Sequence, residues 1–127
     1  MYKLTKEQEL IQKAAREYAE KTIEPLGAQI DRENLIPREI LNDLADLGMF
    51  SIPFPEEYGG GEAGYLSYIL ALEQLCKASL GIGMIISVNA VGLSVLNAFG
   101  SEELKKRCMP DAASGRTIMS FAFTEPG

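Results

Sequence analysis

The sequence predicts an all-α fold, an orthogonal bundle of about five helices that is followed by a short C-terminal β-segment. Three features support this prediction. Apolar residues recur at helical spacing in the N-terminal half, and residues 78–101 contain no charged side chain. The last ten residues, IMSFAFTEPG, begin like a buried strand and end in a tight turn.

The first predicted helix begins after Thr5, a candidate N-cap, because Gln8 follows three residues later as a capping box requires. Its apolar stripe falls at positions i, i+3, i+4 and i+7, which are Ile11, Ala14, Ala15 and Tyr18. The same stripe continues with Ile23, Leu26 and Ile30. Because proline cannot donate a helical hydrogen bond, Pro25 predicts a kink or a restart within this segment.

The second predicted helix begins at Pro37, where a missing N–H group costs nothing in the first turn. Its inner face consists of Ile40, Leu41, Leu44 and Leu47. Gly48 is a natural helix end. Residues 49–64 contain two prolines and a run of glycines, which predicts a loop. Its apolar side chains are expected to pack against the core; they are Phe50, Ile52 and Phe54.

Two apolar helices are predicted next, over residues 65–76 and 80–99. The first is expected to be largely buried because its apolar positions cover more than one stripe; they are Leu66, Ile69, Leu70, Leu72 and Leu75. The second carries no charge, and Gly100 ends it. It is long enough to cross a bilayer, but its serines, asparagines and glycines favour a helix buried on all sides in a protein core.

A short polar helix capped by Ser101 follows, with Glu102 and Glu103 at its start and three basic residues, Lys105, Lys106 and Arg107, near its end. After Pro110, a turn around Ser114 and Gly115 leads to a predicted strand over residues 117–124. A single strand needs hydrogen-bonding partners. We expect residues 1–116 to form a helical domain and residues 117–127 to open a further β domain that lies beyond residue 127. The alternative is a strand that pairs with another chain.

Composition excludes several classes of function. A net charge of −6 argues against nucleic-acid binding, and the absence of histidine removes the commonest general base and metal ligand. Cys76 and Cys108 lack metal-ligand or redox spacing, so we interpret them as reduced packing residues of a cytosolic-type protein. The N-terminus lacks the apolar core of a secretory signal. The residues alone therefore predict neither a metal site nor catalytic machinery.

The chain resembles the acyl-CoA dehydrogenase family in four segments, which in order are LTKEQELIQKAAREYAEKTIEPLGAQIDREN, IPREILNDLADLGMF, PEEYGGGEAGYLSYILALEQL and FGSEELKKRCMPDAASGRTIMSFAFTEPG. The resemblance covers residues 4–127, and short-chain, butyryl-CoA dehydrogenase-like members are most similar. It implies an N-terminal helical domain, followed in the family by a β domain and a helical bundle. The implied reaction is α,β-dehydrogenation of acyl-CoA thioesters with FAD. The family's catalytic base lies in the C-terminal bundle, so no residue of this chain is assigned a catalytic role.

The resemblance also implies binding residues. Phe121, Phe123 and Thr124 match positions at the flavin ring, and Met84 and Ser87 match positions at the end of the acyl-chain pocket. The alternative is that these five residues only pack the fold. The resemblance further implies an electron-transferring flavoprotein as partner and a homotetramer when the enzyme is intact. Its location would be the cytoplasm, or the mitochondrial matrix in a eukaryote. The 127-residue chain alone is expected to be inactive.

A different class of function remains open at this point. The chain could be a non-enzymatic helical interaction module whose C-terminal strand adds to the sheet of a partner protein. A membrane-associated helical protein is the other alternative, because of the uncharged stretch over residues 78–101.

Overall fold

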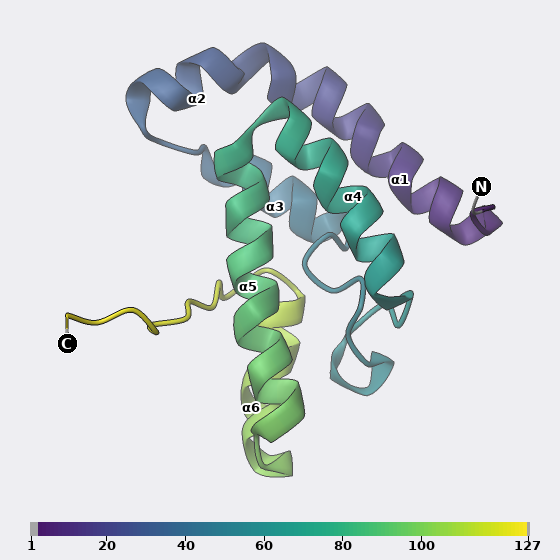
Figure 1. The fold of residues 1–127 in the computed structure, drawn as a ribbon, viewed down its shortest axis with the longest axis vertical. Coiled ribbons are helices and arrows are strands. Elements are labelled where there is room, and N and C mark those ends of the chain that lie inside the picture. The colour runs from purple at the N-terminus through teal and green to yellow at the C-terminus, as the bar shows by residue number, and fades with distance from the viewer. Residues whose placement is uncertain (1–2, 127) are drawn as a thin grey trace.

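The computed structural model describes residues 3–126, and α-helices make up most of this part of the chain. The helices are α1 (Lys6–Tyr18), α2 (Gly27–Glu33), α3 (Arg38–Asp46), α4 (Gly64–Ala78), α5 (Leu80–Phe99) and α6 (Glu102–Ala113). Figure 1 shows α1 alongside α4, while α5 runs at a steep angle from the end of α4 and has α6 beside it. The predicted all-α class is confirmed.

The N-terminal helix is capped and interrupted where the sequence predicts. The Gln8 backbone N–H donates to Thr5 Oγ1 at 3.2 Å, and the Thr5 N–H donates to Gln8 Oε1 at 3.0 Å, which completes the capping box. After Tyr18 the chain forms a π-helical turn, η1 (Ala19–Ile23), and a 3₁₀ turn, η2 (Glu24–Leu26), that contains Pro25. The apolar stripe stays buried through this interruption at Ala15, Ala19 and Ile23.

The loop between α3 and α4 contributes large side chains to the core. Gly48 has a φ of +72°, a conformation that favours glycine, and redirects the chain after α3. Phe50, Ile52 and Phe54 are all buried, as predicted. The loop folds back on itself because the N–H groups of residues 60–63 bond to carbonyls within residues 51–55. At Gly60, a Cβ atom would lie 1.9 Å from the Phe54 carbonyl oxygen, so only glycine fits there. A 3₁₀ turn, η3 (Glu56–Tyr58), lies within this loop.

Helix α6 continues through Pro110, and the predicted turn follows it at Ser114 and Gly115. The helix extends to Ala113, and the residues around the proline are buried: Met109, Ala112 and Ala113. Proline removes one helical hydrogen bond, but burying this turn against the core outweighs that loss. The three basic residues therefore lie in the middle of α6 and not in its last turn.

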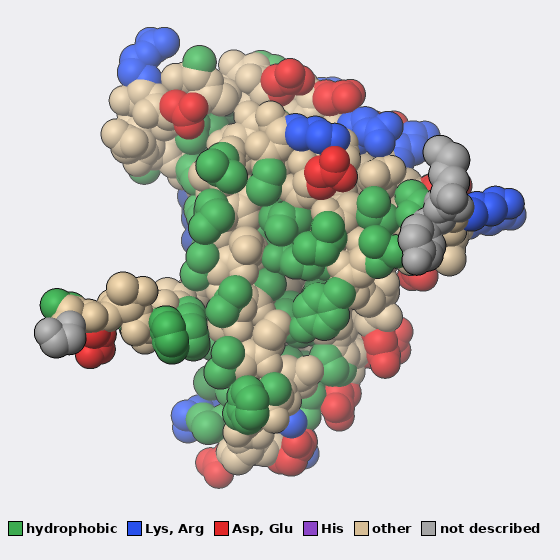
Figure 2. Space-filling model, in the orientation of Figure 1, with side chains coloured by type: hydrophobic (Ala, Val, Ile, Leu, Met, Phe, Trp, Pro, Cys, Tyr) green, Lys and Arg blue, Asp and Glu red, His purple; other side chains and the backbone are tan. Residues whose placement is uncertain are grey.

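The predicted burial on all sides is wrong for α5, and α4, which the sequence predicts to be largely buried, has one exposed apolar face. On α4, Leu75 is fully buried, whereas Leu66 and Ile69 are 51% and 52% exposed. On α5, the exposed apolar residues are Leu80, Met84, Val91, Val95 and Phe99. The main neighbours of α5 in residues 3–126 are α4 and α6, which cover only part of its circumference. Figure 2 shows the resulting concentration of hydrophobic side chains over α4 and α5.

Helix α5 is long and apolar enough to span a membrane by length and composition alone, and it is the single such helix in residues 3–126. The core helix of a soluble protein can meet the same criterion. The membrane-spanning interpretation therefore rests on length and composition only.

Residues 118–126 have no regular secondary structure, and they extend away from the bundle in Figure 1. The strand predicted over residues 117–124 is not formed within the described part of the chain. A strand is stable only when its N–H and C=O groups bond to a neighbouring strand. Residues 3–126 provide no such neighbour.

Candidate functional site

The C-terminal segment leaves the bundle over the middle of α5, where Asn89 holds it. The Asn89 side chain is fully buried; its Nδ2 donates to the Ala112 carbonyl at 3.2 Å, and its Oδ1 accepts from the Met119 N–H at 2.8 Å. A Cβ atom at Gly92 would lie 2.9 Å from the Met119 Cβ, so the absence of a side chain there permits this close approach. One side chain of α5 thus contacts both the end of α6 and the departing segment.

A shallow apolar cavity of about 300 Å³, broadly open to solvent, lies between α5 and this segment. Its lining residues are Met84, Ile85, Val88, Ile118, Met119 and Ser120. The structure therefore places Met84 at a cavity whose walls are almost entirely apolar. Such walls suit a flexible hydrocarbon group, because burying apolar surface is favourable and needs no polar partner.

Ser87, the second residue predicted for the acyl pocket, does not line this cavity. Its side chain is half-buried and lies near the Tyr68 phenol of the neighbouring helix α4. Burial raises the pKa of Tyr68, and hydrogen bonding with Ser87 lowers it in part. The structure thus places Met84 and Ser87 in different surroundings, although both belong to α5.

The three residues predicted to contact the flavin lie just beyond the cavity. Phe121 and Phe123 are 46% and 79% exposed, and their rings stack with centroids 5.6 Å apart. Thr124 is also exposed. No hydrogen bond within residues 3–126 uses the backbone of residues 120–126. This part of the segment therefore presents aromatic faces, free backbone groups and one hydroxyl.

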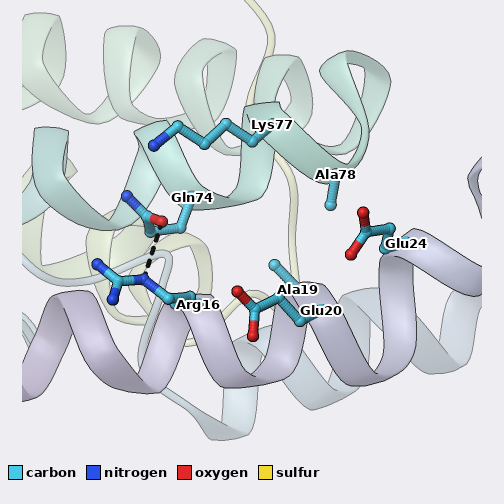
Figure 3. A pocket seen from close by; sticks show the side chains of 7 residues that line it. All are labelled: Arg16, Ala19, Glu20, Glu24, Gln74, Lys77 and Ala78. Carbon is cyan, nitrogen blue, oxygen red and sulfur yellow. Dashed lines mark hydrogen bonds between the residues drawn. The ribbon is translucent and has the colours of Figure 1, made fainter.

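A second, polar pocket lies between α1, η1, η2 and α4, and the sequence gives no sign of it. It has a volume of about 190 Å³ and is lined by Arg16, Ala19, Glu20, Glu24, Gln74, Lys77 and Ala78. Figure 3 shows the Arg16 Nε donating to Gln74 Oε1, a contact of 3.3 Å. Two cations and two carboxylates line the pocket together. This mixture selects for neither anionic nor cationic ligands.

Tyr58, from the PEEYGG motif, connects the loop to α6. Its hydroxyl donates to Glu102 Oε2 at 2.9 Å, and Lys105 Nζ lies 3.1 Å from the other carboxylate oxygen. The hydrogen bond with Glu102 raises the pKa of Tyr58 to about 12. The hydrogen bond from Tyr58, followed by Lys105, lowers the pKa of Glu102. This motif therefore has a structural role in attaching the loop.

Metal binding has no support in the described residues. Within residues 3–126, no group of three or more Cys, Asp or Glu side chains could hold a metal ion. Cys76 and Cys108 are both free thiols. Burial raises the pKa of the Cys76 thiol, which disfavours the reactive thiolate.

Comparison with known proteins agrees with this arrangement of helices. Residues 5–116 match the family model described as acyl-CoA dehydrogenase, N-terminal domain. The short-chain specific acyl-CoA dehydrogenase of Clostridium acetobutylicum is 38% identical over 126 residues, which are 98% of this chain and 33% of that protein. The chain thus spans about a third of the length of this relative.

Solved structures also match most of this chain in fold and in sequence. The butyryl-CoA dehydrogenase of Megasphaera elsdenii matches 99% of this chain and 34% of its own, with a TM-score of 0.91 and 31% identity. A structure of the electron transferring flavoprotein of Acidaminococcus fermentans, described in terms of flavin-based electron bifurcation, matches 93% of this chain and 31% of its own. Its TM-score is 0.88, at 34% identity.

A family model that covers most of the chain defines the class: the protein has the helical N-terminal domain of a dehydrogenase. The chain belongs to the acyl-CoA dehydrogenase family.

Proposed function

We propose that this chain acts as the N-terminal domain of an FAD-dependent acyl-CoA dehydrogenase that introduces a double bond between Cα and Cβ of acyl-CoA thioesters. Residues 1–116 would form the helical domain, and residues 117–127 would open a following β domain. The family match over residues 5–116 carries this proposal. The relatives' names favour short acyl chains.

The apolar cavity supports a role in holding the acyl chain. Met84 lines it from α5, and an unbranched thioether side chain adapts to a flexible hydrocarbon. We assign Met84 to the wall that contacts the acyl chain. Ser87 stays a proposed acyl-pocket residue on α5, although it does not line this cavity itself.

The exposed segment after the cavity is suited to one face of a flavin. Phe121 and Phe123 offer aromatic surface, the free backbone groups can bond to the ring's polar edge, and Thr124 adds a hydroxyl. FAD, when bound, would supply the acceptor for the hydride that leaves Cβ. This chain would orient the ring and exclude water from its apolar side. The base that removes the α-proton would come from another part of the enzyme.

The names of the similar proteins also support the proposed partners. An electron-transferring flavoprotein would accept electrons from the reduced flavin, which agrees with the similarity to the Acidaminococcus fermentans structure. The intact enzyme would be a homotetramer. It would act in the cytoplasm of a bacterium or in the mitochondrial matrix of a eukaryote.

The isolated chain tests whether the proposed flavin and acyl sites need other domains of the enzyme. If it supplies one wall of the flavin and acyl sites, the purified 127-residue protein should neither retain FAD nor oxidise butyryl-CoA. The measurement is gel filtration after incubation with excess FAD, with flavin absorbance followed in the protein peak. A chain that stays yellow at one FAD per protein would refute the proposal that the site needs further domains.

The exposed apolar face of α4 and α5 favours a second candidate, a non-enzymatic module that binds a partner protein. Exposed apolar patches of this kind mark interaction sites. The dehydrogenase domain and the partner-binding module differ in whether they take part in flavin reduction. Only a dehydrogenase domain is expected to support flavin reduction when it is joined to the other domains of such an enzyme.

A further inference from the structure

We infer that Asn89 is a positioning residue, which sets the course of residues 119–124 relative to helix α5. Its amide is the only side chain in residues 3–126 that bonds to the backbone of the segment beyond residue 117. The importance of this course for the flavin rests on the proposed function, because the proposed flavin-contacting residues begin two positions after Met119. The positioning itself is a property of the chain alone.

The geometry at Asn89 requires both ends of an amide. The Oδ1 accepts the Met119 N–H at 2.8 Å, while the Nδ2 donates to the Ala112 carbonyl at 3.2 Å. Ala112 lies in the last turn of α6, and its carbonyl accepts both from the Gly115 N–H at 3.2 Å and from the Asn89 amide. The side chain must therefore present an acceptor toward the segment and a donor toward α6. Leucine has a similar shape but provides neither group.

The surroundings make these two bonds decisive for the segment. Asn89 is 0% exposed, so water cannot replace it as a partner. The neighbouring Gly92 allows Met119 to approach the backbone of α5 closely. The upstream contact is the Thr117 N–H, which donates to the Asp111 carbonyl at 3.1 Å. Residues 121–126, which follow Met119, are exposed, so the bond to Asn89 is the last one that holds the segment before them.

The position of Asn89 links two proposed sites. On the same helix, Met84 and Val88 line the apolar cavity, and Met119 closes the opposite wall of that cavity. Releasing Met119 from Asn89 would therefore move one wall of the acyl cavity and, at the same time, the start of the flavin-contacting segment. Asn89 therefore sets the spacing between the proposed acyl cavity and the proposed flavin-contacting segment.

The test measures exchange of the Met119 backbone amide with deuterium, by NMR, in the 127-residue chain. Asn89→Leu should accelerate this exchange at least about fivefold, the value of one ordinary hydrogen bond. Asn97→Ala is the matched control, because Asn97 lies on α5 and makes no side-chain hydrogen bond within residues 3–126. It should leave Met119 exchange unchanged.

Asn89→Asp separates positioning from simple space filling. A protonated carboxyl has one acceptor and one O–H donor, so it can replace both amide contacts, whereas the ionised form has no donor for Ala112. Protection of the Met119 amide in Asn89→Asp should therefore recover in acidic buffer and fall in alkaline buffer, and Asn89→Leu should show no such pH dependence.

Unchanged Met119 exchange in Asn89→Leu, or the absence of acid recovery in a folded Asn89→Asp protein, would overturn the inference. Neither measurement involves flavin or acyl-CoA. The exchange measurements therefore test the role of Asn89 even if the proposed enzymatic function is wrong. A negative result for Asn89 would not count against the enzymatic function.

Discussion

Leu75 and Leu66 lie on the same helix, α4, but differ completely in their surroundings: the first is fully buried and the second is 51% exposed. Leu75→Ala should lower the free energy of unfolding by about 2–5 kcal/mol, since it removes buried methyl groups and leaves a cavity. Leu66→Ala should cost less than about 1 kcal/mol, as surface substitutions do. Urea denaturation of both variants measures the difference. Equal losses would mean that the exposed face of α4 is covered in solution.

The Tyr58–Glu102 contact predicts a pH-dependent contribution to stability. The pKa of Glu102 is lowered from 4.5, so its contribution is fully present above pH 4.5 and is lost as the pH falls through the lowered value. The pKa of Tyr58 is raised from 10.0 to about 12, so its contribution is full below pH 10.0 and is lost as the pH rises through about 12.

Tyr58→Phe removes the hydroxyl that is the largest cause of the shift at Glu102. The stability difference between wild type and this variant should therefore be greatest between these two limits and shrink on either side. Thermal unfolding across the pH range provides the measurement. A difference that does not vary with pH would show that the hydrogen bond is not formed in solution.

At the scale of elements, α4 and α5 pack closely because Gly83 faces Cys76. A Cβ atom at Gly83 would lie 2.1 Å from the Cys76 Sγ. Gly83→Ala should therefore destabilise the chain by about 1–3 kcal/mol, the cost of overpacking. In a Cys76→Ala background the cost should fall by at least about 1 kcal/mol, because the sulfur is absent and alanine favours the helix. Chemical denaturation of the four proteins forms the cycle, and equal costs in both backgrounds would contradict this packing.

Local sequence signals predict where most helices begin and end. Thr5 with Gln8, Pro25, Gly48 and Ser101 act through their own backbone geometry or through partners a few residues away. The structure confirms each of them. The place of the three basic residues in α6 is predicted less well, since the helix extends past Pro110 through buried contacts that a local pattern does not contain.

Burial and site geometry are predicted less well from sequence. Apolar composition indicates that α4 and α5 are hydrophobic, but which faces are covered depends on the neighbours they meet in space. Resemblance placed Met84 at an apolar cavity, while Ser87 lies outside its lining. Asn89 and the Arg16–Gln74 pocket join residues far apart in sequence, so no spacing pattern signals them.

The whole molecule combines a closed helical core with two open features, the apolar face over α4 and α5 and the segment after Met119. The chain spans about a third of its Clostridium acetobutylicum relative. We propose that those features form one side of a site that other domains complete. The roles of Met84 and of the segment after Met119 depend on this assignment.

The most direct test joins this chain to the complementary part of the Clostridium acetobutylicum short-chain enzyme, in place of the matching 33%. The measurement is the visible absorbance of bound flavin after butyryl-CoA is added without oxygen, with the unaltered enzyme as control. We predict that the chimera retains flavin and that its absorbance is bleached by butyryl-CoA, as in the control. A folded chimera that retains flavin but stays oxidised, while the control is bleached, would contradict the account.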